Sequence, residues 1–446
     1  TEYFVSPNGN DANSGTSASE PFQTLAKLST LTLNAGDRIY FEAGQTFPGN
    51  LILHPGSTDA SNPVFINTYP ADGQATIVAG AGADGVLLED FPGIDISHLK
   101  VTAPLAGNGR PTNPYSGINV RVVNSSQGVF YTRIHDVEVS GFNKPGIYLN
   151  SKRTDAGLIN VEVVNADLHH NGSAGLYSDA PYPTIVHYGI TLSHVSASYN
   201  SGDGNLQDNS GSGIVLSGVE GGLINECEAF ENGSYNQATK GGPMGIWCWD
   251  ARNVTIQYCY SHHNRTTTKD GGGFDIDGGS ENCTIQYCYS AYNEGEGYGL
   301  FEFGSPLPWR NNTMRFNISY QDGLKFDAGA LHLWAENGKT LEHATIYNNT
   351  FNGPRGVVFV NNNFSNSRFA NNILDCGTTY LGSPANLTLQ TNYEGSVNFI
   401  HPGFYLPAGS PLNSGGSVLA NTDMGNEDFH HRPLNGVYPI GASQAQ

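Results

Sequence analysis

The sequence predicts an all-β solenoid, in which short parallel strands return coil after coil without helices between them. Glycine followed by an aliphatic or aromatic residue opens a strand-like phrase at intervals of about thirty residues, a period typical of solenoid repeats. The 56 glycines and the low share of charged residues, 13%, indicate many tight turns and few solvated helices. An asparagine stands a few residues before most phrases. The phrases open at Gly117, Gly146, Gly175, Gly213, Gly245, Gly273, Gly299 and Gly356, and the asparagines are Asn143, Asn171, Asn200, Asn232, Asn264 and Asn293, with Gln321 in the next place.

The ends of the chain differ from the repeats. The segment Pro21–Leu28 has the apolar spacing of a short amphipathic helix, which we expect to cap the open end of the coils. We predict one domain over residues 1–446, with the cap and first strands in 1–45, β-helix coils in 46–400 and a closing segment in 401–446. Repeat architectures grow in one dimension, so this length does not require a second core.

Two residue types recur at equivalent positions inside the repeats. Asparagine tolerates the left-handed backbone of a sharp turn, and its amide can bond the equivalent amide one coil away, so an asparagine ladder is expected. Cys227, Cys259 and Cys288 recur in the same way and predict a buried stack of structural thiols.

These phrases, the asparagine ladder and the N-terminal cap resemble the right-handed parallel β-helix proteins of the pectate-lyase-like superfamily. The tail from Ala408 to Gly415 is similar to the closing segment of secreted carbohydrate-active enzymes of this fold. The resemblance implies a fold over nearly the whole chain and a carbohydrate substrate. The motif sets of the polygalacturonases and of the alginate epimerases are missing from the sequence, which argues against those two families.

Alternation along each strand divides the phrases between two faces. Ile246, Phe274, Leu300 and Leu331 fall on a buried face. The other face is predicted to be the floor of a groove, with the long loops 201–212, 233–244 and 265–272 as its walls. One column of this floor is Asn119, Tyr148, Tyr177, Val215, Trp247, Asp275, Phe301 and His332, and the next is Arg121, Asn150, Asp179, Ser217, Trp249, Asp277, Phe303 and Trp334.

Asp275 and Asp277 are the predicted catalytic pair. Their backbones stand roughly 6.6 Å apart on one strand face, near the separation of about 6.5–9.5 Å that an inverting glycosidase needs between its acid and its base. Two carboxylates this close also raise the pKa of one of them, which keeps a proton available. Simple solvation of both carboxylates, or calcium binding by them, is the alternative.

Three further residues are weighed as parts of the site. Glu302 alternates inward, where a carboxylate is costly, so we expect a one-residue shift that turns it toward the groove as a third carboxylate. His332, two coils from Asp275, is expected to bind substrate hydroxyls or to adjust the pKa of a carboxylate. Asp179 is interpreted as a subsite contact.

Lys325 supports a competing chemistry, β-elimination from a uronan. A lyase needs a base for the proton beside a carboxylate and a cation that neutralises the carboxylate. Lys325 as the base, with a calcium ion held by Asp275, Asp277 and Asp327, would supply both. Some β-helix lyase families use similar residue types, but no diagnostic motif is present.

The favoured hypothesis is a secreted glycoside hydrolase that needs no cofactor and acts on a polysaccharide or oligosaccharide. Asp275 and Asp277 are its acid and base, Glu302 and His332 are accessory residues, and aromatic side chains are its sugar platforms. A calcium-dependent uronan lyase and a non-catalytic glycan-binding β-helix are the alternatives. The predicted glycan contacts are Trp247, Trp249, Trp334, Tyr148, Tyr177, Asp179 and Arg121.

Charge and hydropathy restrict the partners. A net charge of −20 argues against nucleic acid and anionic membranes. The low count of Lys and Arg, 20 in all, places hydrolysis ahead of elimination, because few cations are present to meet a polyuronate. No apolar run approaches the roughly 18 residues of a membrane span. We expect a monomer that is secreted, periplasmic or on the cell surface.

Overall fold

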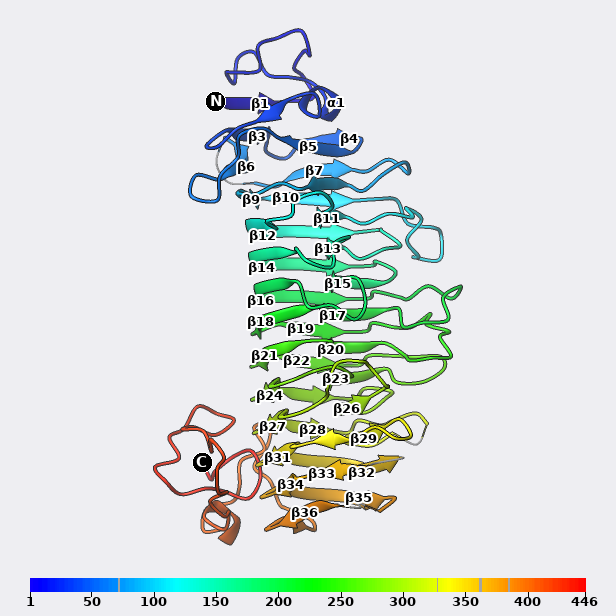
Figure 1. The fold of residues 1–446 in the computed structure, drawn as a ribbon, viewed down its shortest axis with the longest axis vertical. Coiled ribbons are helices and arrows are strands. Elements are labelled where there is room, and N and C mark those ends of the chain that lie inside the picture. Colours follow the sequence, from blue (N-terminus) through cyan, green and yellow to red (C-terminus); the bar gives the residue numbers. More distant parts are fainter. Residues whose placement is uncertain (71–72, 327, 361–362, 384–385) are drawn as a thin grey trace. The chain divides into compact units, whose positions relative to one another are not determined.

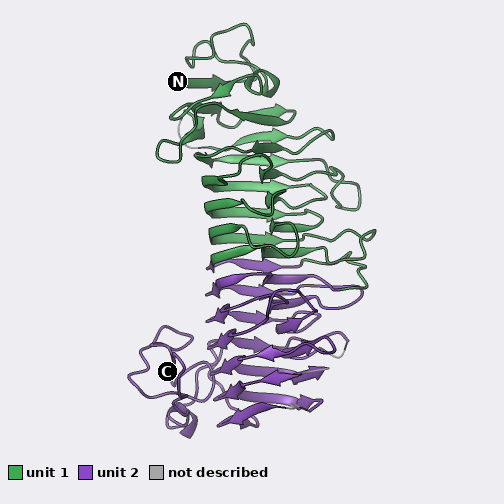
Figure 2. Cartoon of the chain, in the orientation of Figure 1, with its two compact units in different colours: residues 1–223, 232–240 green, residues 224–231, 241–446 purple. Residues whose placement is uncertain are grey.

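The computed structural model describes the chain except for residues 71–72, 327, 361–362 and 384–385. It divides the chain into two compact units (Figure 2). Unit 1 is Thr1–Leu223 with Asn232–Lys240, and unit 2 is Ile224–Glu231 with Gly241–Gln446. The expectation that residues 1–446 form one domain stays a prediction.

Unit 1 is built from stacked parallel strands behind an N-terminal cap (Figure 1). The short helix α1 (Leu25–Leu28) lies within the predicted segment, Thr24 caps its N-terminus, and Leu25 and Leu28 are buried. The strands that begin in this unit are β1 (Glu2–Val5), β2 (Thr32–Leu33), β3 (Arg38–Glu42), β4 (Thr46–Pro48), β5 (Leu51–Pro55), β6 (Val64–Tyr69), β7 (Ala75–Val78), β8 (Val86–Glu89), β9 (Ile94–Ser97), β10 (Leu99–Thr102), β11 (Ile118–Val122), β12 (Val129–Ser140), β13 (Ile147–Ser151), β14 (Leu158–His169), β15 (Ala174–Asp179), β16 (His187–Ser198), β17 (Ser212–Ser217) and β18 (Val219–Asn225).

Unit 2 continues the same architecture and ends in a long irregular segment. Its strands are β19 (Glu228–Phe230), β20 (Met244–Trp249), β21 (Arg252–Gln257), β22 (Tyr260–His262), β23 (Gly272–Ile276), β24 (Thr284–Gln286), β25 (Tyr289–Ala291), β26 (Tyr298–Glu302), β27 (Thr313–Arg315), β28 (Ile318–Tyr320), β29 (Leu331–Ala335), β30 (Leu341–Glu342), β31 (Thr345–Tyr347), β32 (Thr350–Val360), β33 (Phe364–Ser365), β34 (Ser367–Ala370), β35 (Ile373–Leu381), β36 (Leu387–Gln390) and β37 (Tyr393–Glu394), followed by the 3₁₀ helix η1 (Pro411–Asn413).

Each strand pairs in parallel with the strand one coil away, which confirms the predicted all-β fold of parallel coils. In unit 2, β20, β23, β26 and β29 form one such column, and β21, β24, β27 and β31 form another. Interior side chains of successive coils stack on one another. Phe274 and Tyr298, for example, lie with their rings 5.2 Å apart and nearly parallel. A continuous apolar core therefore runs through each unit.

The asparagine ladder is present, with two corrections. In unit 1, the backbone N–H groups of Asn171 and Asn200 donate to the side-chain oxygens of Asn200 and Asn232, both over 3.0 Å. Asn143 is not a member, because Phe142 occupies the equivalent position and donates to Asn171. In unit 2 the ladder runs from Asn264 through Asn293 and ends on a carboxylate, since Asn293 donates to Asp322 and not to Gln321.

The predicted thiol stack is also present. Cys227, Cys259 and Cys288 are free and buried, and the backbone N–H of Cys227 lies 3.5 Å from the sulfur of Cys259. The next coils place asparagine in the same column, and Cys288 donates its backbone N–H to Asn317 over 2.9 Å. Among the described residues, no helix is long and apolar enough to cross a membrane.

Candidate active site

The acidic strand predicted from the sequence is β23, and its neighbours in unit 2 are β20 and β26. Trp247 lies opposite Asp275 as expected. The register of the next strand differs from the prediction: Asp275 lies opposite Gly299, and Gly299 lies opposite His332. Phe301 therefore does not stand between Asp275 and His332.

The register differs because β26 starts its phrase two residues earlier than expected. Gly297, and not Gly299, is the counterpart of Gly273, since its carbonyl accepts the hydrogen bond from Phe274 N over 3.0 Å. Tyr298 then stacks on Phe274. A glycine thus replaces the expected aromatic residue in the column of Asp275.

Gly299 leaves room that neighbouring side chains fill. A Cβ at this position would lie 2.7 and 2.8 Å from ring atoms of Phe301 and 3.0 Å from Asp275 Oδ1. The Phe301 ring also meets His332 edge to face, with centroids 5.2 Å apart. The absence of a side chain at position 299 therefore lets Asp275, Phe301 and His332 converge.

Asp275 is the more buried of the two predicted catalytic residues. It is 1% exposed, whereas Asp277 is partly exposed. Burial raises the pKa of Asp275 well above its usual range, and the charges of Asp277, Glu296 and Asp270 raise it further. Burial also raises the pKa of Asp277, although its Oδ1 accepts a hydrogen bond from Gly278 N over 2.7 Å, which favours the ionised form. The two aspartates thus present different access to a substrate.

Asp270 belongs to the same cluster, although the sequence did not predict it. It precedes β23 in the loop of 265–272, and its carboxylate accepts a hydrogen bond from Gly242 N. Burial, reinforced by the charge of Glu296, raises the pKa of Asp270 to about 6, and this residue in turn raises the pKa of Asp277. Its signal in the sequence was weak: an aspartate at the end of a long loop, directly before the glycine run 271–273.

Glu296 and His332 complete the cluster. Glu296 is 1% exposed, and its Oε2 lies 3.9 Å from His332 Nδ1. His332 was expected in the site from the sequence, whereas Glu296, which lies in the turn before β26, was not. Alternation identifies groove-facing carboxylates only within strands. Because Glu296 lies in a turn, no alternation pattern predicted that it faces the site.

Glu302 is buried, contrary to the expectation that a shift turns it toward the groove. It is 2% exposed and alternates inward with Leu300. Its Oε1 accepts hydrogen bonds from the backbone N–H groups of Gly304 and Ser305, over 2.7 and 3.0 Å, and these bonds satisfy the buried carboxylate. Nearby Asp250, also 2% exposed, accepts a hydrogen bond from the Ser305 hydroxyl, and burial raises its pKa to about 6.

Of the three tryptophans predicted to contact glycan, one is buried and two are partly exposed. Trp247 is 3% exposed, so the prediction that its face forms a sugar platform is wrong. Alternation assigns a side chain to a face, but it does not reveal whether that face is covered. Trp249 and Trp334 are partly exposed and meet Phe303 and Phe301 edge to face. These two indoles remain candidate platforms.

Lys325 is engaged outside the aspartate pair. Its Nζ donates to Glu294 over 2.8 Å and to the carbonyl of Thr266 over 2.7 Å. Asp327, the third ligand of the calcium alternative, lies outside the described residues. Within the described part of the chain, no group of three or more His, Cys, Asp or Glu side chains is arranged to hold a metal ion.

The predicted glycan contacts of unit 1 share one strand face in the expected register. Tyr148 pairs with Tyr177, and the column of Arg121 continues to Asp179 through Asn150. The Tyr148 hydroxyl donates to Asp179 over 2.7 Å, and Arg121 forms an ion pair of 2.6 Å with Glu89. Whether these side chains contact a glycan stays a prediction.

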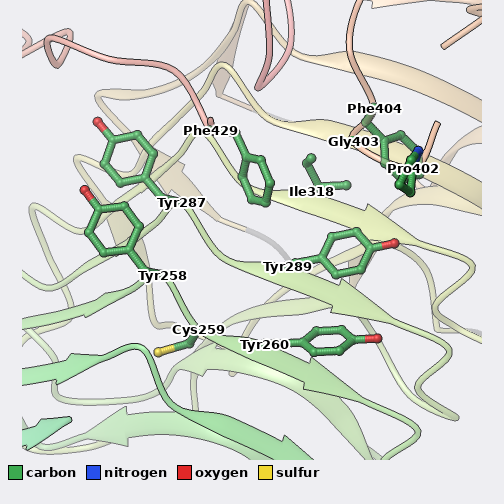
Figure 3. Close-up of a pocket in the computed structure, with 10 residues that line it drawn as sticks. All are labelled: Tyr258, Cys259, Tyr260, Tyr287, Tyr289, Ile318, Pro402, Gly403, Phe404 and Phe429. Carbon is green, nitrogen blue, oxygen red and sulfur yellow. The ribbon is translucent and has the colours of Figure 1, made fainter. Parts of the chain in front are cut away.

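A cavity of about 320 Å³ lies in unit 2 under the C-terminal segment (Figure 3). Its lining is largely aromatic, and none of its described lining residues carries a carboxylate. Acid and base chemistry is therefore assigned to the cluster around β23. The aromatic lining residues are Tyr258, Tyr260, Tyr287, Tyr289, Phe404 and Phe429.

Comparison with known proteins decides the handedness of the coils. Residues 116–317 match the family model described as the right handed beta helix region. The chain is a right-handed parallel β-helix. The structure also resembles the pectate lyase Pel9A, with a TM-score of 0.55 at 17% identity over 100% of this chain and 96% of that one. The A-module of the mannuronan C-5 epimerase AlgE6 of Azotobacter vinelandii gives 0.58 at 15% identity over 83% of this chain and 95% of the module.

Two relatives of this β-helix carry the name of a glycosidase. A lacto-N-biosidase of Bifidobacterium longum subsp. longum is 26% identical over 215 residues, which is 41% of this chain and 13% of that protein. The structure of the GH136 lacto-N-biosidase from Eubacterium ramulus gives a TM-score of 0.58 at 19% identity and covers 87% of this chain and 68% of that one. The chain therefore spans about an eighth of the length of the curated relative.

Proposed function

We propose that the protein is a glycoside hydrolase, with Asp277 and Asp270 as its acid and base. The observation that carries the proposal is the carboxylate cluster at β23, in which burial raises the pKa of Asp270, Asp275 and Asp277 and the charge of Asp270 raises the pKa of the other two further. Carboxylates this close cannot all ionise, so the cluster retains a proton at neutral pH. Glycosidases need one protonated and one ionised carboxyl group at the scissile bond.

Solvent exposure identifies which two carboxyl groups of the cluster can reach a substrate. Asp277 and Asp270 are partly exposed, whereas Asp275 is 1% exposed. We therefore place Asp270 beside Asp277 at the glycosidic bond and assign Asp275 a supporting role. Burial and the charge of Asp270 raise the pKa of Asp277 and keep a proton on the pair. The resemblance to lacto-N-biosidases supports a glycosidase, since one protein of that name shares this fold and another is 26% identical over 215 residues.

The surrounding charges favour hydrolysis over elimination. A uronan would bring carboxylates against Asp270, Asp275, Asp277 and Glu296, and Lys325 is paired with Glu294. An uncharged glycan meets no such repulsion. Trp249 and Trp334 offer partly exposed indole faces for stacking on sugar rings.

The test is digestion of neutral and acidic glycans with and without a chelator, with reducing ends and the ultraviolet absorbance of unsaturated uronates read together. Hydrolysis releases reducing ends without absorbance. Asp277→Asn and Asp270→Asn should each lower turnover by about 10²–10⁴-fold while glycan binding persists. The matched control is Glu342→Gln, since the Glu342 side chain is 44% exposed.

Other outcomes would replace the proposal. Absorbance that disappears with the chelator would identify the calcium-dependent lyase and redirect attention to Lys325. Glycan binding without turnover in any well would identify a non-catalytic binding protein. Full activity in both aspartate variants would contradict the assigned pair.

A further inference from the structure

Three buried polar atoms of the active-site cluster lack hydrogen-bond partners within the described part of the chain. They are Asp275 Oδ1, Glu296 Oε1 and His332 Nε2. Both Asp275 and Glu296 are 1% exposed, so solvent does not compensate them. Leaving such groups unpaired costs free energy, so native proteins rarely retain them without a catalytic role or a bound molecule that completes the bonds.

The three atoms belong to one place on the sheet. Asp275 and His332 flank Gly299 in the same column, one strand spacing to either side. Glu296 approaches from the turn before β26, and its second oxygen lies 3.9 Å from His332 Nδ1. Asp275 Oδ1 lies over the bare backbone of Gly299, 3.0 Å from the point that a Cβ would occupy. The unpaired atoms thus gather around Gly299, where the ring of Phe301 enters the space that a side chain would occupy.

We propose that Asp275, Glu296 and His332 form a recognition site for the hydroxyl groups of an uncharged sugar ring, next to Asp277. A sugar hydroxyl both donates and accepts, so it can satisfy carboxyl oxygens and an imidazole nitrogen in either protonation state. This inference rests on the proposed function, because it gives the sugar bound beside the reacting pair its chemical class.

Aromatic and charged neighbours agree with this class of ligand. The ring of Phe301 packs edge to face against His332 and Trp334, with centroids 5.2 and 6.3 Å apart, and is 8% exposed. The partly exposed indole of Trp334 therefore provides the apolar surface for the C–H groups of a sugar. Asp277 and Asp270 lie close enough to Asp275 that, in addition to burial, their charges raise its pKa. A uronic acid would therefore meet repulsion where a neutral sugar meets hydrogen-bond partners.

The experiment measures sugar binding to the full chain carrying Asp277→Asn, which prevents turnover during titration. Saturation-transfer NMR and calorimetry are run with galactose, glucose, mannose, N-acetylglucosamine and glucuronate as probes. We expect at least one neutral sugar to bind and glucuronate to bind at least tenfold more weakly. Adding Glu296→Gln or His332→Ala should weaken neutral-sugar binding about tenfold or more, whereas adding Glu342→Gln should leave it unchanged.

Each failure has a distinct meaning. Unchanged sugar affinity in both Glu296→Gln and His332→Ala, or tighter binding of glucuronate than of every neutral sugar, would overturn the inference. If Glu296→Gln unfolds, as its thermal transition would show, the conservative Glu296→Asp and the His332 variant carry the test. Sugar binding that depends on Glu296, in a protein that hydrolyses no glycan, would uphold this site and overturn the proposed function. Hydrolysis that depends on Asp277, with an unchanged KM in the Glu296 variants, would uphold the proposed function and overturn this sugar site.

Discussion

Replacing Gly299 with alanine tests whether the space over this residue organises the site. The new Cβ would lie 2.7 and 2.8 Å from two atoms of the Phe301 ring and 3.0 Å from Asp275 Oδ1. Contacts this short do not persist, so the ring and the carboxyl group must move. Overpacking of this kind costs about 1–3 kcal/mol of unfolding free energy. The backbone at Gly299 is not left-handed, so the cost comes from space alone.

The same displacement should reduce catalysis more than stability. A catalytic arrangement that shifts by about 1 Å loses roughly 10²-fold in rate. Because a few tenths of an ångström would relieve the clash with Asp275, we expect a loss of about 10- to 100-fold in kcat/KM on the best glycan of the digestion panel. The thermal transition is measured in parallel by calorimetry.

A rescue and a control separate this explanation from general damage. Gly299→Ala combined with Phe301→Leu removes the ring atoms nearest the new methyl group and should recover most of the lost stability. Gly107→Ala is the control, since a Cβ there meets no atom within 4 Å. Wild-type kcat/KM in Gly299→Ala would refute the reasoning, because it would mean that Asp275 and Phe301 can be displaced without consequence.

Further predictions concern protons and ladders. Burial raises the pKa of Asp270 to about 6, so hydrolysis that uses its ionised carboxylate as the base should rise as pH passes through about 6 and the proton is lost. A rate that does not rise between about pH 5 and 7 would exclude that role. Burial also raises the pKa of Asp250 to about 6, so its ionisation above that pH favours unfolding. In denaturant titrations at pH 8, Asp250→Asn should therefore be more stable than wild type by up to roughly 3 kcal/mol. This gain in stability should disappear near pH 4. The control Asp208→Asn, at an exposed position, should show no gain at either pH. Asn293→Ala leaves the backbone and side-chain N–H groups of Asn264 without their acceptor and removes the side-chain donor to Asp322, so it should cost about 2–4 kcal/mol in urea titrations. A loss no greater than that of an exposed asparagine variant would show that the ladder is not structural.

The coils could be predicted from the sequence because their markers are repeated. Each Gly phrase and each turn asparagine has equivalents in other coils, so one misplaced member does not hide the period. The ladder positions predicted at Asn143 and Gln321 lie one residue away, at Phe142 and Asp322. In the first coil an apolar residue holds the position beside a turn asparagine, and in the last a carboxylate holds it beside a glutamine, so residue type alone does not identify which one faces the next coil.

The site was less predictable because it depends on departures from the repeat. The register at Gly299 is decided by which of two neighbouring glycines opens the phrase, and alternation cannot distinguish Gly297 from Gly299. Asp270 and Glu296 lie in turns, where neither a period of two nor a coil repeat applies. The burial of Trp247 depends on what covers the outer face, which strand periodicity does not encode.

The stacked thiols make folding sensitive to the redox conditions of the compartment in which the chain folds. All six cysteines are free, and Cys227, Cys259 and Cys288 are at most 2% exposed once stacked. Before stacking, the same thiols are open to oxidation and to pairing with the wrong partner. If the chain folds in an oxidising compartment, the coils that contain them must close before the thiols react. The speed of coil closure would then determine the yield of native protein, and a reductant present only during the first moments of refolding would raise that yield.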